Sequence, residues 1–275
     1  MSKGKFILAD GSFVPAENYC LSIEESEAPH FSEQFRAIKT SFPFFSATVE
    51  VIKLKLLLFN RSFPEFTEDE GAGLKRQMER TLTKNKHFIG AKVTLILRFL
   101  NEKISYSIQS EVTKSAGYEL NEKGLFAEVF DKIQKPASSL STLTLGSVPY
   151  WEIAERYRSE SSADEYLIIS TSDAILEAPF ANVYIITGKK VRGASSHDGA
   201  YIDITQSLML AIFNQLNLEY TDNEEITLED LNCAEEVFSV NAIEGIRWII
   251  GIGGKRYFNN TTRKISELFA QLATK

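Results

Sequence analysis

Short apolar runs separated by polar turns predict a mixture of strands and helices in the first half of the chain. Residues 5–16 (KFILADGSFVPA) predict a hairpin, because Asp10-Gly11 supplies the positive φ angles of a tight turn. Residues 46–63 are apolar over a length that favours a helix despite their β-branched side chains. Residues 66–85 predict another helix, which we expect to begin at a capping box formed by Thr67 and Glu70. The strands expected in this half are 31–45, 91–101 and 103–112, the last two as antiparallel neighbours.

A polar, glycine-bearing run at residues 113–124 separates two halves that both mix strand and helix periodicity. We therefore expect an α/β (α+β) protein with a small N-terminal domain over 1–115, a linker over 116–124 and a larger C-terminal domain over 125–275. The strands expected in the second half are 125–133, 165–170, 182–187 and two within 234–252, and the helices are 149–157, 203–217 and 261–273.

The segment 139–156 (SLSTLTLGSVPYWEIAER) raises a separate question. Leucines alternate with hydroxyl-bearing residues from Leu140 to Leu145, which is typical of a strand, and a Gly-Ser-Val-Pro turn follows. Pro149 suits the first turn of the predicted helix, where its missing N–H costs nothing. A strand that ends in such a turn is either a structural element or one wall of a site.

Charge and composition exclude several classes of function. The formal net charge of −7 argues against a general nucleic-acid partner, which needs a basic surface. No apolar run reaches the roughly 18–20 residues that span a membrane. Two cysteines, Cys20 and Cys233, cannot build a disulfide framework, so we expect a reduced, cytoplasmic setting. The three histidines have no metal-ligand spacing to one another or to a cysteine, and we expect no metal site.

Two features carry candidate chemistry. The start of the helix at Asp203 offers unpaired backbone N–H groups and the Thr205 hydroxyl, which suit a phosphate; ordinary helix capping is the alternative. Glu177 lies in an apolar run before a turn and a buried strand. An acid there is either half buried, with a partner such as a protonated ring nitrogen, or a surface acid at a strand end.

The order of these pieces resembles one family. "SADEYLIIS…ILEAPFANVYIIT", "DITQSLMLAIFNQLNLEYTD" and "LEDLNCAEEVFSVNAIEGIRWI" resemble successive blocks of the class IV aminotransferases, and "HFSEQFRAIKTSFPFF" resembles their N-terminal "FETiR" strand. These fold type IV enzymes include branched-chain aminotransferases, D-amino-acid aminotransferases and aminodeoxychorismate lyases. The resemblance implies two domains that hold pyridoxal phosphate between them, a homodimer, and an amino or keto acid as substrate.

The resemblance also assigns roles to residues. Glu177 matches the glutamate that pairs with the pyridine N–H⁺, with Asn182 as the asparagine after it. Arg36 matches the arginine on the substrate side. The residues that match the two phosphate-binding loops are Ile204, Thr205, Asn241 and Ala242.

The same resemblance predicts that catalytic groups are missing. Counting from both Ala154 and Asp164 places Thr144 where the family has its Schiff-base lysine, and no lysine lies between Lys135 and Lys189. Threonine forms no imine and is no base near neutral pH. Val51 stands where the family has the phosphate arginine, and Asp203 replaces the glycine of the "GIT" motif.

Three hypotheses follow. The first is a member of this fold without aminotransferase activity, whose cleft is empty, binds pyridoxal phosphate weakly or binds another small anion. The second is a working aminotransferase or aminodeoxychorismate-lyase-like enzyme that uses another lysine, such as Lys135 or Lys189. The third is a non-enzymatic interaction protein that keeps the old dimer surface. Fold alone does not separate them.

Overall fold

The structure is a computed structural model that describes residues 3–39, 41–101, 103–145 and 148–274. The chain divides into two compact units between Gly117 and Tyr118, and each is described here by itself. Unit 1 is Met1–Gly117 and unit 2 is Tyr118–Ala273. Among the described residues, none of the helices combines the length and the apolar composition that crossing a membrane requires.

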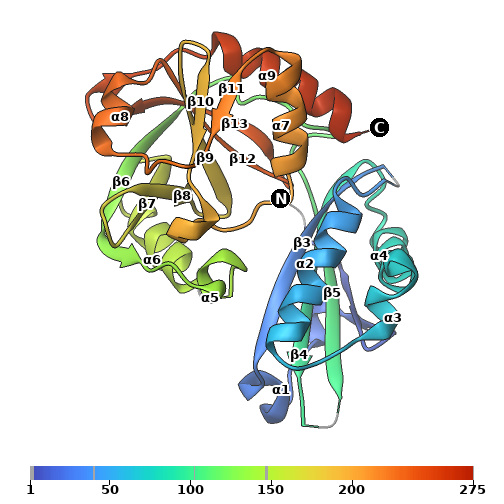
Figure 1. Cartoon of the computed structure of the whole chain (residues 1–275). Coiled ribbons are helices and arrows are strands. Elements are labelled where there is room, and N and C mark those ends of the chain that lie inside the picture. Colours follow the sequence, from blue (N-terminus) through green and yellow to red (C-terminus); the bar gives the residue numbers. More distant parts are fainter. Residues whose placement is uncertain (1–2, 40, 102, 146–147, 275) are drawn as a thin grey trace. The chain divides into compact units, whose positions relative to one another are not determined.

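Unit 1 is built on an antiparallel sheet with the strand order β2-β1-β5-β4-β3 (Figure 1). Helix α2 packs against β3, and α4 packs against β1 and β5. Alternate residues of β4 (Val93, Leu95 and Leu97) are fully buried, as expected for a sheet with one face covered by helices. The elements are β1 (Phe6–Ala9), β2 (Ser12–Pro15), α1 (Ile23–Glu27), β3 (His30–Ile38), α2 (Phe45–Leu58), α3 (Pro64–Thr67), α4 (Ala72–Asn85), β4 (Gly90–Phe99) and β5 (Ile104–Val112).

Most predictions for this half are confirmed. Strands β1 and β2 pair around Asp10 and Gly11, whose φ angles are 45° and 82°, so the dipeptide forms the expected left-handed turn. The long apolar stretch is helix α2, and β4 pairs antiparallel with β5.

The predicted capping box at Thr67 and Glu70 is wrong. Thr67 ends the short helix α3, and its hydroxyl donates to the Phe63 carbonyl. Glu70 has a φ of 55°, outside the helical region, and α4 begins only after Gly71, whose φ is 79°. The left-handed backbone before Ala72 interrupts what the sequence pattern presents as one helix.

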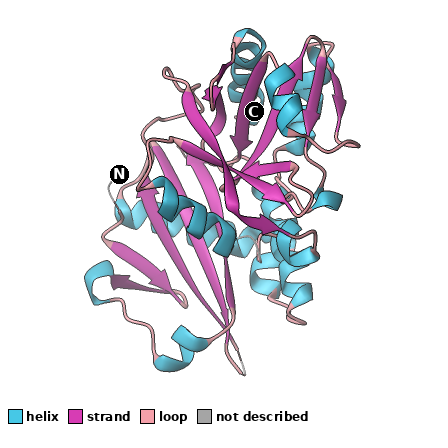
Figure 2. Cartoon of the chain, turned by 90° about the vertical axis from the view of Figure 1, so that its left-hand side faces the viewer, coloured by secondary structure: helices cyan, strands magenta, loops and turns pink. Residues whose placement is uncertain are grey.

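Unit 2 contains a nine-stranded sheet that curls into a pseudo-barrel (Figure 2). Eight of the strands follow the order β11-β10-β9-β12-β13-β6-β7-β8, and the ninth, β14, pairs with β13. Strand β8 also pairs with β9, so the strands from β9 to β8 form a closed ring. Buried apolar residues of these strands, such as Leu167, Val183 and Val237, fill one core. The elements are β6 (Leu125–Lys135), α5 (Ser139–Thr142), α6 (Val148–Arg158), β7 (Glu165–Ser170), β8 (Ile175–Ala178), β9 (Ala181–Thr187), β10 (Lys190–Gly193), α7 (Gln206–Gln215), β11 (Glu219–Thr221), α8 (Leu228–Cys233), β12 (Glu236–Asn241), β13 (Gly245–Ile252), β14 (Lys255–Arg256) and α9 (Asn260–Ala273).

The strand predicted from Leu140 to Leu145 is wrong. This segment contains the short helix α5, because Ser138 caps it: its hydroxyl accepts a hydrogen bond from the Ser141 backbone N–H at 3.1 Å. Serine side chains form hydrogen bonds with nearby backbone groups, and here this local bonding outweighs the preference of the alternating leucines for a strand. Helix α6 follows as predicted, and the expected turn at Gly146-Ser147 lies outside the described residues.

Candidate functional site

Glu177 is the central residue of the site in unit 2. It lies on β8, which closes the barrel, and its side chain is completely buried. Its strand partner is Asn182, directly across the β8–β9 hairpin, so both motif residues are at one end of this hairpin. The alternative of a surface acid is excluded. A carboxylate in this position needs partners from the protein or from a ligand.

Protein groups supply these partners. The ammonium of Lys135, at the end of β6, lies 2.6 Å from Oε1 of Glu177, and the Trp151 indole Nε1 on α6 donates to the same oxygen at 2.7 Å. The backbone N–H of Tyr201 donates to Oε2 at 2.8 Å. Lys135 is also completely buried, and Trp151 is 1% exposed. Each oxygen of the carboxylate therefore has at least one internal donor.

Burial and the ion pair shift the pKa values of Glu177 and Lys135 in opposite directions. Burial raises the pKa of Glu177, while Lys135 and the hydrogen bonds from Tyr201 and Trp151 oppose this effect. Burial lowers the pKa of Lys135, and Glu177 opposes it. The two charges compensate each other where both side chains are completely buried. Removal of either charge alone would leave the other buried without a counter-charge and would destabilise the fold.

Aromatic rings surround this pair. The Trp151 ring lies 4.4 Å from that of Phe180 and contacts the Tyr201 ring edge-on at 5.3 Å, measured between centroids. The Lys135 ammonium lies 5.9 Å from the centre of the Trp151 ring. The Tyr201 hydroxyl donates to the Phe180 carbonyl at 3.0 Å. Trp151 thus fixes the Glu177 carboxylate by its N–H and fills the adjoining space with its ring.

Thr144, the predicted position of the Schiff-base lysine, follows α5. Its φ of 67° lies in the left-handed region, which is unusual for a β-branched residue. The Thr142 carbonyl accepts a hydrogen bond from the Ile202 backbone N–H at 2.8 Å. The segment that carries Thr144 therefore lies beside the loop that leads into α7.

The start of α7 carries the predicted phosphate residues. Thr205 is completely buried and is the N-cap residue, and Ile204 precedes it. The Thr205 backbone N–H donates to Oδ1 of Asp203 at 2.9 Å, and its hydroxyl donates to Oδ2 at 2.8 Å. Burial raises the pKa of Asp203 to about 6, against the hydrogen bonds from Thr205, which lower it. The expected helix start at Asp203 is thus two residues early, and Asp203 binds the cap residue instead.

The second predicted phosphate loop is the β12–β13 turn. Oδ1 of Asn241 accepts the backbone N–H groups of Ile243 and Glu244, at 2.9 and 2.7 Å, and so stabilises the turn itself. The Ala242 carbonyl accepts the Tyr118 hydroxyl at 2.7 Å. Both predicted residues thus serve the local structure of unit 2.

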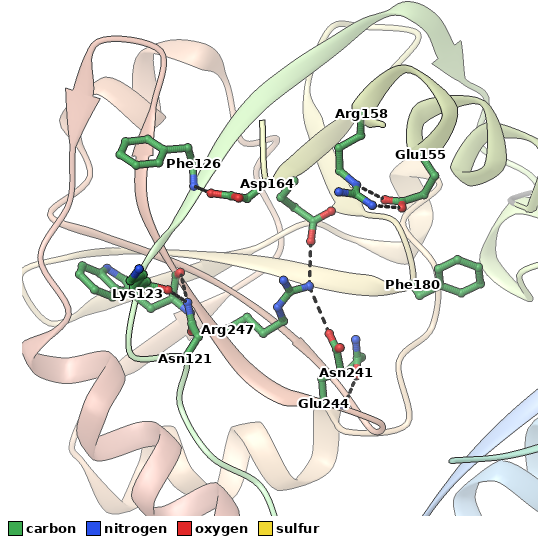
Figure 3. A network of polar contacts seen from close by, with 12 residues as sticks. Asn121, Lys123, Phe126, Glu155, Arg158, Asp164, Phe180, Asn241, Glu244 and Arg247 are labelled. Carbon is green, nitrogen blue, oxygen red and sulfur yellow. Dashed lines mark hydrogen bonds and ion pairs between the residues drawn. The ribbon is translucent and has the colours of Figure 1, made fainter. Parts of the chain in front are cut away.

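Beside this turn lies the polar network of Figure 3. Arg247 contacts Glu165 at 3.2 Å and Glu244 at 3.1 Å, while Glu155 and Arg158 pair with each other on α6. Glu165 is 4% exposed, and burial raises its pKa to about 7 although Arg247 lowers it.

Glu165 gives the stability of the protein a particular pH dependence. Its folded-state pKa is raised above the value of 4.5, so its contribution is largest below pH 4.5 and is lost as the pH rises through about 7. The loss amounts to about 3 kcal/mol. We expect the free energy of unfolding, measured in urea between pH 5 and pH 8, to fall with pH, and to fall less in Glu165→Gln. Glu244→Gln, which changes the exposed partner of the same arginine, should keep the wild-type slope; an equal slope in all three proteins would contradict the assignment.

The two remaining residues of the sequence prediction belong to unit 1. Arg36, on β3, is 4% exposed and donates to the carbonyls of Ser115 and Gly117 at 2.6 and 2.9 Å. These contacts tie the end of unit 1 to its sheet. Val51 lies on α2 and is partly exposed. The role of Arg36 on the substrate side and the loss of the phosphate arginine at Val51 both stay predictions.

Comparison with known proteins identifies the family. The amino-transferase class IV family matches residues 72–252, which is more than half of the chain. The chain belongs to the class IV aminotransferases. No curated protein sequence matches it.

Solved structures show the fold. A branched-chain aminotransferase of Thermoproteus uzoniensis with norvaline superposes with a TM-score of 0.82 at 18% identity, covering 98% of this chain and 95% of that one. The branched-chain amino acid aminotransferase of Thermobaculum terrenum in its holo form gives 0.83 at 13% identity over 99% and 95%. A proposed 4-amino-4-deoxychorismate lyase of Legionella pneumophila gives 0.78 at 17% identity over 93% and 96%. The predicted two-domain fold type IV architecture is thereby confirmed.

The family's cofactor does not fit the residues at this site. A pyridine N–H⁺ needs a carboxylate whose charge is free to pair with it, and the charge of Glu177 is already compensated by the Lys135 ammonium at 2.6 Å, with both side chains completely buried. A phosphate at the start of α7 needs the N–H and hydroxyl of Thr205, and both donate to Asp203. The sequence indicates Lys135 only as a substitute amine. It does not reveal that Trp151 and Tyr201 bind Glu177. The only signal near Trp151 is the predicted helix that begins at Pro149, which contains this residue.

Proposed function

We propose that this protein is a class IV aminotransferase homologue without aminotransferase activity. The observation that carries the proposal is the buried ion pair between Glu177 and Lys135, at 2.6 Å, with both side chains completely buried. In an active member the glutamate keeps the cofactor ring an electron sink by pairing with its nitrogen. Here the charge of Glu177 is used to compensate a lysine of the same chain.

The residue at Thr144 supports the proposal independently. The resemblance aligns Thr144 with the Schiff-base lysine, and a hydroxyl neither forms an imine nor accepts a proton near neutral pH. A transaminase needs one amine for both tasks. Loss of that amine removes the 1,3-proton transfer even where a cofactor is held nearby.

The test is chemical trapping. The purified protein is mixed with pyridoxal phosphate, its visible spectrum is recorded, and borohydride reduction is followed by peptide mapping. We expect scattered, substoichiometric labelling of exposed lysines and no band assignable to one site. Stoichiometric labelling of a single lysine, together with turnover of an amino acid, would refute the proposal.

A working enzyme that uses Lys135 is the second candidate. In its favour, Lys135 touches the site glutamate and burial lowers its pKa, as nucleophilic lysines require. Against it, the pyridine nitrogen and the aldehyde carbon lie at opposite edges of the cofactor ring. Because Glu177 would pair with the pyridine nitrogen, an amine bound to Glu177 lies at the edge of the ring away from the aldehyde carbon. Labelling confined to Lys135 and abolished in Lys135→Met, but unchanged in Lys189→Met, would establish this candidate; its substrate would be an amino or keto acid.

We also propose a homodimer in the cytoplasm. The family resemblance supports the dimer, and the exposed Leu54, Leu57 and Leu58 on α2 offer an apolar surface for a second copy of the chain. Cys20 and Cys233 are both free, which fits a reduced compartment. Light scattering would decide the oligomeric state. A stable dimer with no trapped cofactor would favour the third hypothesis, an interaction protein on the same fold.

A further inference from the structure

The carboxylate of Asp203 occupies the polar groups at the start of α7. It is 5% exposed, and its two oxygens accept the backbone N–H and the hydroxyl of Thr205. Two oxygens of a phosphate group accept from an N–H and a hydroxyl at a helix start in the same manner. Asp203 stands where the family motif has a glycine.

A second carboxylate of unit 2 provides a comparison. Glu236 accepts the backbone N–H groups of Thr261 and Thr262 and the Thr262 hydroxyl, at the start of α9. It is 4% exposed, so both helices begin on a buried carboxylate. Capping alone accounts for Glu236. What distinguishes Asp203 is its surroundings.

Asp203 is part of one continuous array with the buried pair. Two residues before it, Tyr201 donates its backbone N–H to Glu177, and the Tyr201 ring contacts Trp151. At one end of this array, the indole N–H of Trp151 donates a hydrogen bond to the Glu177 carboxylate. At the other end, an anionic group meets the buried helix start. A ring N–H and an anion are the two recognition groups of pyridoxal phosphate.

We infer that Trp151 and Asp203 are built-in substitutes for the cofactor, the indole N–H in place of the ring N–H⁺ and the carboxylate in place of the phosphate. This inference deepens the proposed function and rests on it. The internal groups satisfy the site without a ligand and repel an incoming phosphate at Asp203. The start of α7 is thus a latent anion site, closed by the chain itself.

The decisive experiment removes the internal anion. Asp203→Gly restores the residue of the family motif, and Asp203→Asn removes the charge in case the glycine variant does not fold, with circular dichroism as the check. Glu236→Gly is the matched control, because it removes the buried carboxylate of α9. The probe is inorganic phosphate at about 20 mM, compared with sodium chloride of equal ionic strength, and the readout is Tm.

We expect phosphate to raise the Tm of the Asp203 variants by about 3 °C or more and to leave the wild type and Glu236→Gly unchanged. An equal rise in the wild type or in Glu236→Gly would overturn the inference, and so would the absence of a rise in both folded Asp203 variants. Inorganic phosphate forms no bond with a lysine. Failure here is therefore distinct from failure of the proposed function, which borohydride trapping reports.

Discussion

Lys135→Met should lower the free energy of unfolding by about 3–5 kcal/mol, because it leaves the carboxylate of Glu177 buried without its counter-charge. Glu177→Gln should be comparably destabilising, since it leaves the Lys135 ammonium uncompensated. The double variant should recover much of this loss, because neither charge then remains. Urea unfolding of the four proteins gives the coupling energy between the two residues.

The control for this cycle is Lys132→Met. Lys132 pairs with Asp131 at 2.9 Å, three residues before Lys135, but its side chain is 58% exposed. Exposed pairs contribute little, so this variant should have wild-type stability. Losses in the single variants that simply add in the double variant would show that the Lys135–Glu177 pair is not coupled and would contradict the account of the site.

Trp151→Ala has the other large expected effect, a loss of about 3–5 kcal/mol, because it empties a fully buried position between two aromatic rings. Trp151→Phe keeps most of the ring but removes the N–H that binds Glu177 at 2.7 Å. Its cost should be smaller, about 1.5–3 kcal/mol, as for a hydrogen bond to a charged group.

Trp248→Phe is the control for the indole N–H. The Trp248 indole donates to the Phe258 carbonyl at 3.1 Å in an exposed contact, so water replaces the lost partner. Thermal or urea unfolding should show little change. A Trp151→Phe variant as stable as Trp248→Phe would mean that the indole N–H does not hold the Glu177 carboxylate.

The elements that could be predicted from the sequence are those fixed by local signals. The Asp10-Gly11 turn specifies its hairpin through backbone conformation, and the helix α2 follows from the length of an apolar run. The failures arise where local signals compete. Leucine alternation favoured a strand at 140–145, but Ser138 caps a helix there. After Thr67, the left-handed residues Asp69, Glu70 and Gly71 delay the start of α4 until Ala72, and the hydrophobic pattern does not reveal them.

The site shows the same division. Glu177 and the start of α7 could be located from family motifs in the sequence. Their partners could not all be located, because Lys135 and Trp151 are 42 and 26 residues before Glu177 and reach it only through the closed barrel and α6. The hydrogen bonds of Asp203 to Thr205 are local, yet the sequence left open whether a ligand or a protein group takes them.

The central claim is that the partners of Glu177 are internal and not those of a cofactor. Its most direct test is calorimetric titration of the wild-type protein with pyridoxamine phosphate, which has the ring nitrogen and the phosphate but no aldehyde to react with surface lysines. We predict no saturable heat up to about 1 mM ligand. A Kd of about 1 mM corresponds to a standard binding free energy of about −4 kcal/mol. Saturable binding of one ligand per chain within that concentration range would contradict the account.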